Sequence, residues 1–200
     1  MQITLDSSDI PQILRYLGYR NTGLTETDER NISEAIELTN SIIKPATVWK
    51  LFSLQYETEG ILLSPALAPG NRAVLLGESI RKHLNHAKEA VLLCVTIGRD
   101  FDVEVEKAMV RNPAFGVTLN ACGIQAVEKL ADSLQFEIDE RLGHKTGIRF
   151  SPGYGDLPLS SQRDFIRLLD ATRKVGVTLN ESFLMNPLKS VTAIAAVTLA

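Results

Sequence analysis

Residues 90–98 read AVLLCVTIG, an almost uninterrupted apolar run that ends in a glycine. Such a run is typical of a central β-strand that is covered on both faces. We therefore expect a sheet with this strand near its middle and with helices packed around it.

Two helices are predicted directly after this run. From Arg99 to Arg111, charged and apolar residues alternate at helical spacing. From Phe115 to about Arg141, little interrupts a helix except Gly116 and Gly123. The apolar stripe of this longer segment consists of Ala121, Ile124, Val127, Leu130, Leu134 and Ile138. We expect it to be the main core helix, with small residues at 121–123 that permit close packing.

Strands, turns and a short helix are predicted between Val48 and Leu84. The apolar runs are VWKLFSL, GILLSP and AVLLG, and the residues that separate them are Pro65, Pro69 and Gly70. This pattern is typical of strands joined by turns. The following ESIRKHL, residues 78–84, predicts a helix.

The N-terminal part predicts a helical layer. Residues 7–9 are helix-capping types, and apolar residues then recur at helical spacing until Gly18. A second helix is predicted from about Glu26 to Ile43. Because no repeat or low-complexity linker is present, we expect one unit over 1–200, with 1–45 as its N-terminal helical layer.

The C-terminal part predicts a loop between short regular elements. An extended piece at 148–150 precedes the loop, and one of the two serines at 160–161 is placed to cap a helix that reaches about Lys174. A turn at Asn186–Pro187 and a terminal apolar strand follow. Because an exposed strand usually has a neighbour, we expect a further segment to follow Ala200 or to pair with this strand.

Composition excludes several classes of protein. The 200 residues are 44% hydrophobic and 22% charged, with a net charge of −3. The sequence has no basic stripe that would bind a phosphate backbone, so we do not expect nucleic acid as a partner. No apolar run approaches the roughly 20 residues that span a bilayer, so we expect a cytoplasmic protein without membrane contact. Cys94 and Cys122 lie in apolar segments, which favours buried structural thiols.

Common catalytic and metal-binding motifs are absent from the sequence. His83 and His86 could share a helix face, but without further ligands nearby we interpret them as surface residues and predict no metal site. No Walker, GxSxG, HExxH or GxGxxG motif occurs, which argues against common hydrolases, kinases and dehydrogenases. The acidic residues of the long helix could hold a cationic ligand, although a solvated face is the commoner arrangement; they are Asp132, Glu137, Asp139 and Glu140.

The most informative segment is RFSPGYGDLP at residues 149–158. Gly153 and Gly155 allow the backbone to approach a ligand closely, and two prolines restrict the loop. Arg149 offers a planar donor for a carboxylate, and Tyr154 offers a ring and a hydroxyl. These features suit a small zwitterion with an aromatic ring. The alternative is a structural turn with Arg149 in a surface ion pair.

The Arg-x-x-Pro-Gly-Tyr core at 149–154 resembles the S-adenosylmethionine-binding loop of the activation domain of vitamin B12-dependent methionine synthase. RFSPGYGDLPL is closer still to short, free-standing relatives of that domain. Downstream, ESFLMNPLKSVTAI resembles the family's second motif through Met185, Pro187, Ser190 and Val191. Upstream, HLNHAKEAVLLCVTIG and VEKLADSL are also similar, so the resemblance extends from about Leu75 to the C-terminus.

The resemblance implies an α+β fold, an antiparallel sheet with surrounding helices. It implies that Arg149 and the backbone at Ser151 bind S-adenosylmethionine, that Tyr154 lies where this ligand meets a corrinoid, and that Pro152 and Gly153 shape the loop. The implied role is that of a reactivation subunit, an accessory or partial methyltransferase. It would support reductive methylation of a cob(II) corrinoid, a cobalamin carried by a partner methionine synthase or corrinoid methyltransferase, with a flavodoxin-like electron donor.

Two departures from the family pattern leave alternatives open. The family's loop histidine is replaced within the stretch 157–160, and the acidic residue before the arginine by Gly143 or His144. Contact with the sulfonium would then come from Asp132, Glu137 or Asp156. The alternative function is a non-catalytic ligand-binding or regulatory module with the same fold, and a third is an interaction domain that uses the loop only as a turn.

Overall fold

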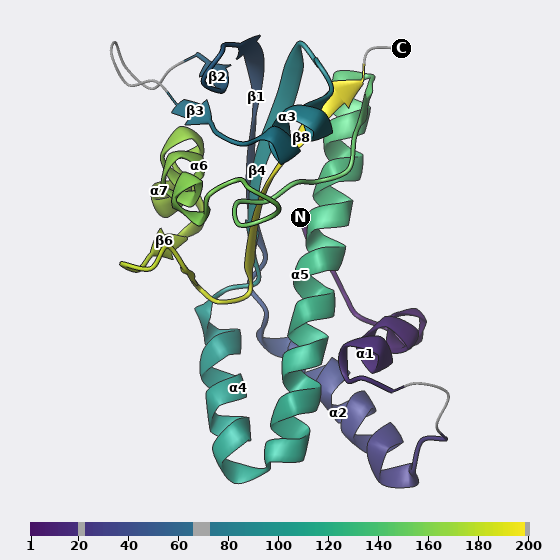
Figure 1. Ribbon diagram of the computed structural model, residues 1–200. Coiled ribbons are helices and arrows are strands. Elements are labelled where there is room, and N and C mark those ends of the chain that lie inside the picture. The colour runs from purple at the N-terminus through teal and green to yellow at the C-terminus, as the bar shows by residue number, and fades with distance from the viewer. Residues whose placement is uncertain (20–22, 66–72, 199–200) are drawn as a thin grey trace.

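The computed structural model describes residues 1–19, 23–65 and 73–198 (Figure 1). Its helices are η1 Ser7–Asp9, α1 Ile10–Tyr16, α2 Glu26–Ile42, α3 Glu78–Leu84, α4 Arg99–Arg111, α5 Pro113–Leu142, η2 Leu159–Ser161, α6 Gln162–Leu169 and α7 Ala171–Val175. Its strands are β1 Ala46–Tyr56, β2 Ile61–Ser64, β3 Ala73–Leu75, β4 Glu89–Thr96, β5 Lys145–Thr146, β6 Thr178–Leu179, β7 Met185–Asn186 and β8 Ser190–Thr198. The expected turn at Pro69 and Gly70 and the chain end at Ala200 lie outside the described residues.

The main sheet has six strands in the order β3-β2-β1-β4-β8-β5, and every neighbouring pair is antiparallel. Strand β4 lies between β1 and β8, and all but its first residue are buried. The central, doubly covered strand predicted from the sequence is therefore confirmed. The terminal strand β8 also has a neighbour on each side, because Thr146 of β5 pairs with Val197. Its expected pairing partner thus lies within the chain.

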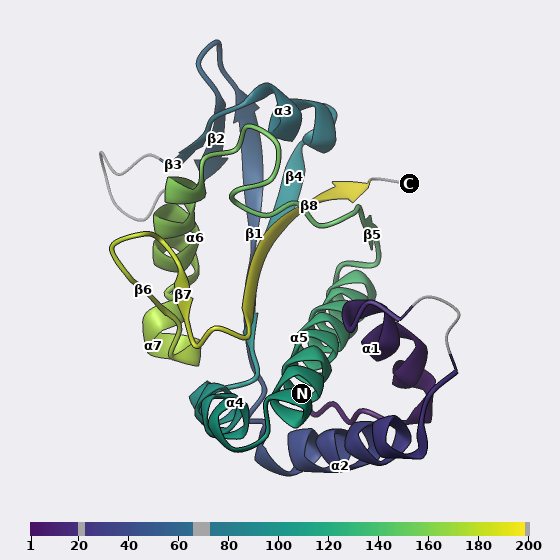
Figure 2. The same ribbon diagram turned by 60° about the horizontal axis from the view of Figure 1, so that its bottom comes forward.

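Two apolar layers cover the sheet, one on each face. Along β4, Val91, Leu93 and Val95 belong to the core shared with α5 and the N-terminal helices. Leu92 and Cys94 belong to the core shared with α3, α6 and α7. Figure 2 shows α5 on one side of the sheet and α6 and α7 on the other. This arrangement of helices around an antiparallel sheet is the predicted α+β fold.

Helix α5 is the predicted main core helix. It begins after Asn112, whose side chain accepts a hydrogen bond from the N–H of Phe115, and it ends at Gly143 in the left-handed conformation. Gly123 lies against Phe101 of α4, and a Cβ there would be 2.2 Å from the ring. The close packing predicted for 121–123 is therefore confirmed.

The N-terminal helices pack on α5. Asp9 is buried, 2.7 Å from the Lys129 ammonium, and Gln125 donates a hydrogen bond to it at 2.8 Å. Burial alone would raise the pKa of Asp9, but hydrogen bonds from Lys129, the Asp6 backbone and Gln125 outweigh it and lower this pKa. The two helices predicted within 1–45 are confirmed.

Cys94 and Cys122 are free, buried thiols, as predicted. They lie in different apolar layers, Cys94 with α6 and α7 and Cys122 with the N-terminal helices. Burial raises the pKa of both thiols to about 12. No helix within the described ranges combines the length and apolarity needed to cross a membrane.

Two local predictions in the C-terminal part were wrong. The helix expected up to Lys174 divides at Asp170, which adopts a left-handed backbone with φ +55°. Neither predicted serine caps it, because Ser161 already has helical dihedrals after the 3₁₀ turn of η2, whereas a capping residue needs an extended backbone. At the extended piece expected for 148–150, Phe150 forms an isolated antiparallel bridge with Ile194.

Candidate functional site

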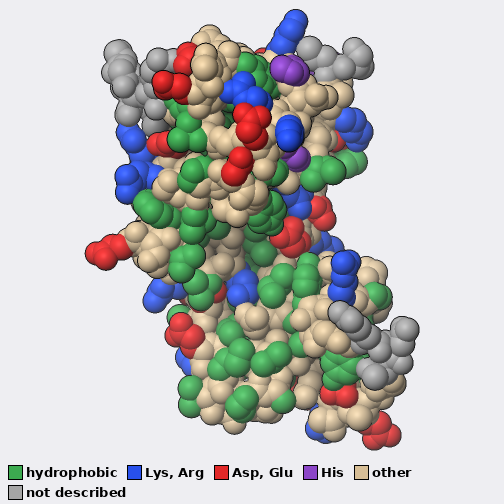
Figure 3. Space-filling model, in the orientation of Figure 1, with side chains coloured by type: hydrophobic (Ala, Val, Ile, Leu, Met, Phe, Trp, Pro, Cys, Tyr) green, Lys and Arg blue, Asp and Glu red, His purple; other side chains and the backbone are tan. Residues whose placement is uncertain are grey.

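A cavity of about 660 Å³ lies between α5, the loop after β5 and the segment before β8. Figure 3 shows the surface hollowed at this place, with hydrophobic side chains along the border. Four of the five predicted site residues line the cavity, namely Arg149, Ser151, Pro152 and Tyr154. Of the second motif, Met185, Ser190 and Val191 line it. Gly153 and Pro187 are not among the lining residues.

Gly153 shapes the loop instead. Its backbone is left-handed with φ +92°, and its N–H donates to the carbonyl of Leu157 at 2.9 Å. Leu157 in turn donates to the carbonyl of Tyr154 at 3.0 Å. Pro152 and Leu157 are buried, whereas the Tyr154 side chain is 59% exposed. The loop therefore folds on itself and presents its tyrosine outward.

One face of α5 carries a polar stripe, defined here as Glu128, Asp132, Gln135 and Asp139, and the first three of these residues form the opposite wall of the cavity. Their spacing of i, i+4, i+7 and i+11 places them on one side of the helix. Asp139 accepts hydrogen bonds from the N–H and hydroxyl of Thr146 at 2.8 and 2.7 Å. Gln135 donates to the carbonyl of Gly147 at 2.7 Å. The polar stripe thus fixes the chain that leads to Arg149.

Arg149 is the only cationic side chain among the described residues that line the cavity. Its Nη1 donates to Gln135 Oε1 at 3.0 Å and its Nη2 to Glu128 Oε2 at 3.0 Å. Nη1 also lies 2.7 Å from Asp132 Oδ1 in an ion pair. A guanidinium has five N–H groups, so donors remain for a ligand carboxylate. Two carboxylates beside one guanidinium leave negative charge for a cationic group of the same ligand.

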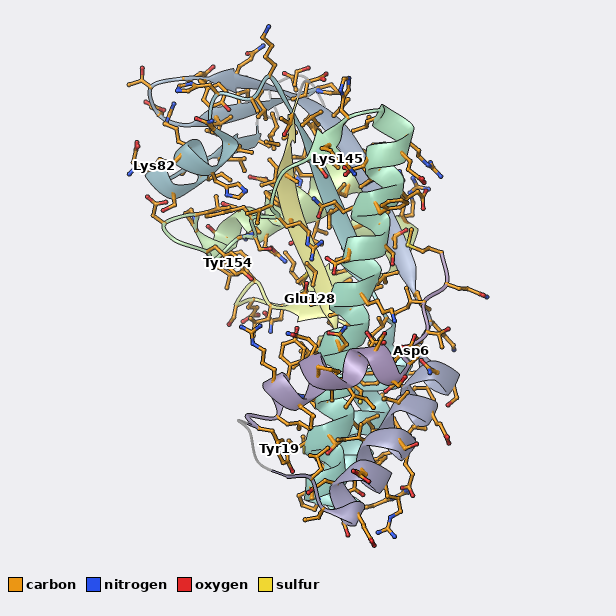
Figure 4. All side chains as sticks on the ribbon, turned by 90° about the vertical axis from the view of Figure 1, so that its right-hand side faces the viewer. Asp6, Tyr19, Lys82, Glu128, Lys145 and Tyr154 are labelled. Carbon is orange, nitrogen blue, oxygen red and sulfur yellow. The ribbon has the colours of Figure 1, made fainter. Side chains whose placement is uncertain are left out.

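Figure 4 shows Tyr154 on the loop and Glu128 on α5, with the loop to the left of the helix in this view. The Tyr154 ring meets Phe150 edge-on at 5.9 Å, and Phe150 lies 4.8 Å from the ring of His83. The Nε2 atom of His83 is 2.7 Å from the carbonyl oxygen of Ile148. His83 is therefore a half-buried residue at the surface that packs against the loop.

The third wall comes from the segment before and within β8. Gln162 is 3% exposed, and its Oε1 accepts a hydrogen bond from the Thr192 hydroxyl at 2.9 Å. Upstream, the N–H of Leu188 donates to Asp102 Oδ2 of α4 at 2.6 Å. The other oxygen of this buried carboxylate has no hydrogen-bond partner among the described residues. Helix α4 therefore holds the second motif against the cavity.

Of the three acidic candidates for contact with a cationic ligand, the structure brings one to the cavity. Asp132 lines it, whereas Glu137 pairs with Arg141 one turn further along α5. Asp156 accepts hydrogen bonds from the first two N–H groups of α3, which lower the pKa of its carboxyl group. Glu128, which was not among the sequence-based candidates, is the second acidic residue that lines the cavity. Among the described residues no group of three or more potential ligands could hold a metal ion.

Comparisons with known proteins match one segment of the sequence and the fold. Residues 128–198 match the family model described as vitamin B12 dependent methionine synthase, activation domain. The fold is similar to a crystal structure of the MetH reactivation domain bound to AdoHcy, with a TM-score of 0.67 and 16% identity over 91% of this chain and 68% of that chain. The comparison with curated proteins gives no match. The matched segment holds the polar stripe, the loop and the second motif, so the family resemblance is confirmed there.

Proposed function

We propose that this chain, whose residues 128–198 carry the activation-domain pattern, binds S-adenosylmethionine in the cavity beside Arg149. The observation that carries the proposal is the placement of one guanidinium between two carboxylates at a cavity of about 660 Å³. This volume falls within the range of small-molecule sites, roughly 300–1,000 Å³.

The residues present suit the parts of this ligand. Arg149 has donors for the amino-acid carboxylate, and Glu128 and Asp132 have negative charge for the ammonium and sulfonium groups. Tyr154 and Phe183 supply rings beside which an adenine can stack. Ser151 contributes backbone at the cavity, while Pro152 and Gly153 fix the course of the loop.

We also propose a partner that carries the corrinoid, a methionine synthase or corrinoid methyltransferase. Exposed apolar side chains border the opening, at Tyr154, Leu159 and Leu184. When bound, the sulfonium supplies the methyl group and the corrinoid accepts it, with an electron from a flavodoxin-like donor. The residues of this chain bind and orient the methyl donor. In this proposal 1–200 act as one unit, supported by the buried contact between Asp9 and Lys129.

One observation favours the alternative of a non-catalytic binding module. The stretch 157–160, where the family places a histidine, has Leu157 buried in the core and Leu159 against the cavity. No imidazole lines the cavity within the described ranges. Ligand binding without corrinoid chemistry would fit this apolar surface.

The first test is isothermal titration of the protein with S-adenosylmethionine. Arg149→Ala removes a charged hydrogen-bonding group, so we expect binding to weaken roughly 10- to 100-fold. Arg149→Lys should recover part of the loss, because it keeps the charge but not the planar donor pair. Arg141→Ala, an exposed arginine at the end of α5 that does not line the cavity, is the control and should bind normally. A folded wild-type protein that binds no S-adenosylmethionine would overturn the proposal.

A second assay separates the two functions. Mixing the ligand-bound protein with a cob(II) corrinoid protein and a reductant should restore the methylated corrinoid spectrum if this chain supports reactivation. Ligand binding without that spectral change, with several corrinoid partners, would favour the non-catalytic module.

A further inference from the structure

Helix α3 contacts the loop at both of its ends. The loop is defined here as residues 148–157. Near the end of α3, His83 Nε2 lies 2.7 Å from the carbonyl oxygen of Ile148, the residue before Arg149. At the start of α3, the Asp156 carboxylate accepts hydrogen bonds from the N–H groups of Glu78 and Ser79 at 2.8 and 2.9 Å. The two contacts bracket the segment that carries Arg149 and Tyr154.

Two glycines allow this close contact. A Cβ on Gly77 would lie 2.5 Å from Asp156 Oδ1, and a Cβ on Gly155 would lie 2.5 Å from the hydroxyl of Ser79. Both glycines have positive φ, +123° and +54°, which side chains rarely adopt. The backbone of each glycine therefore lies against a side chain of the other element, Asp156 or Ser79, with no space for a Cβ at either position.

Helix α3 is itself fixed to the sheet. Ile80 and Leu84 are fully buried in the same apolar layer as Leu157 of the loop. Aromatic contacts continue from this support, because the His83 ring lies against Phe150 and Phe150 meets Tyr154. Tyr154 thus rests on the helix through Phe150, although none of the α3 residues lines the cavity.

We propose that α3 positions the loop for ligand binding, with His83 and Asp156 as positioning residues. The inference rests on the proposed function for its ligand, and it assigns a role to residues outside the cavity. Because no residue of α3 lines the cavity, the helix affects the ligand only by keeping the loop ordered. A loop that is already ordered loses less conformational entropy when the ligand binds, so binding is tighter.

Substitutions at His83 and Asp156 test the two contacts separately. His83→Ala removes both the donor and the ring, His83→Gln keeps a donor, and His83→Phe keeps a ring. Asp156→Ala removes the cap of α3, whereas Asp156→Asn keeps one acceptor. The control is His86→Ala, since His86 is exposed and its ring lies near Tyr56 rather than the loop.

We expect the Kd for S-adenosylmethionine to rise roughly three- to tenfold in His83→Ala and Asp156→Ala. His83→Gln and Asp156→Asn should recover part of this loss, and His86→Ala should match the wild type. Thermal melting of each variant checks that the fold is intact, and the conservative variants provide the test if an alanine variant fails to fold.

Amide hydrogen exchange without ligand separates this inference from the proposed function. The N–H groups of Gly153 and Leu157 are hydrogen-bonded within the loop and should exchange faster in both alanine variants. Unchanged exchange, or faster exchange with an unchanged Kd, would overturn the positioning role. If the wild type binds no S-adenosylmethionine, the proposed function fails, and exchange alone then decides whether α3 orders the loop.

Discussion

Helices α5 and α3 fix the same loop and the chain that leads into it by different means. The 30-residue α5 uses side chains of its polar stripe, which hydrogen-bond to Thr146, Gly147 and Arg149. The seven-residue α3 uses its backbone N–H groups, His83 and a close approach at two glycines. On α5 the contact is divided among several side chains, whereas the α3 contact depends on two glycines that leave no space for a Cβ. We therefore expect added volume to disturb the α3 contact most and charge changes to affect the α5 contact.

The largest effect is expected at the α3 contact from Gly155→Ala. The added Cβ meets Ser79, and φ +54° is strained for alanine, so unfolding free energy should fall by roughly 2 kcal/mol. Urea denaturation measures this change. Ser79→Gly removes the colliding side chain, and the double variant should recover about half of the loss. Equal losses in the single and double variants would show that steric contact with α3 is not the cause.

A smaller effect is expected at the α5 contact from Asp139→Asn. Burial raises the pKa of Asp139, but the hydrogen bonds from Thr146 and Lys145 outweigh it and lower this pKa. The pKa of Asp139 is lower in the folded than in the unfolded protein. The stabilisation is therefore fully present above the unfolded pKa, at about pH 4, and is lost as the pH falls through the folded pKa. Asp139→Asn should cost about 1 kcal/mol at pH 7.

Urea denaturation at pH 7 and near pH 3 measures this dependence, and the difference between wild type and variant should shrink at the lower pH. Glu140→Gln, at the exposed neighbouring position, is the control and should show little difference at either pH. A loss that stays constant with pH would exclude the ionised carboxylate as the source of stability.

The smallest effect on stability is expected from Asp132→Asn. The Asp132 side chain is 71% exposed, so its ion pair with Arg149 should contribute less than about 1 kcal/mol to unfolding. The affinity for cationic S-adenosylmethionine should nevertheless fall severalfold, while that for S-adenosylhomocysteine, with its neutral sulfur, changes less. Calorimetric titration with the two ligands measures this ratio. Equal losses for both would contradict a role in charge recognition.

The same contrast explains what could be predicted from the sequence. The bounds of α3 and α4 follow from local apolar spacing and flanking glycines, and the structure reproduces them. The loop at Arg149–Tyr154 was found because glycine and proline are informative on their own. Glu128 and Gln135 were missed, since polar residues at helical spacing are also typical of a solvated face. This face of α5 is covered only because the chain around Thr146 packs against it, and that contact is not visible in the local sequence.

Long-range contacts account for the other differences. Asp156 was a candidate for the sulfonium, but its partners Glu78 and Ser79 lie far earlier in the chain. The contact of His83 with the loop could not be predicted, because its partner is the backbone carbonyl of Ile148 and every residue has such a carbonyl. Such pairs depend on where the sheet places α3, which local patterns do not specify.

The two cysteines have a practical consequence. Cys94 and Cys122 are the chain's only cysteines, both are buried, and a thiol pKa of about 12 leaves almost no thiolate at neutral pH. Maleimide and other alkylating reagents should therefore leave the folded wild-type protein unmodified. A single cysteine introduced at the exposed Tyr154 would then accept a fluorophore selectively and report on the loop as partners arrive.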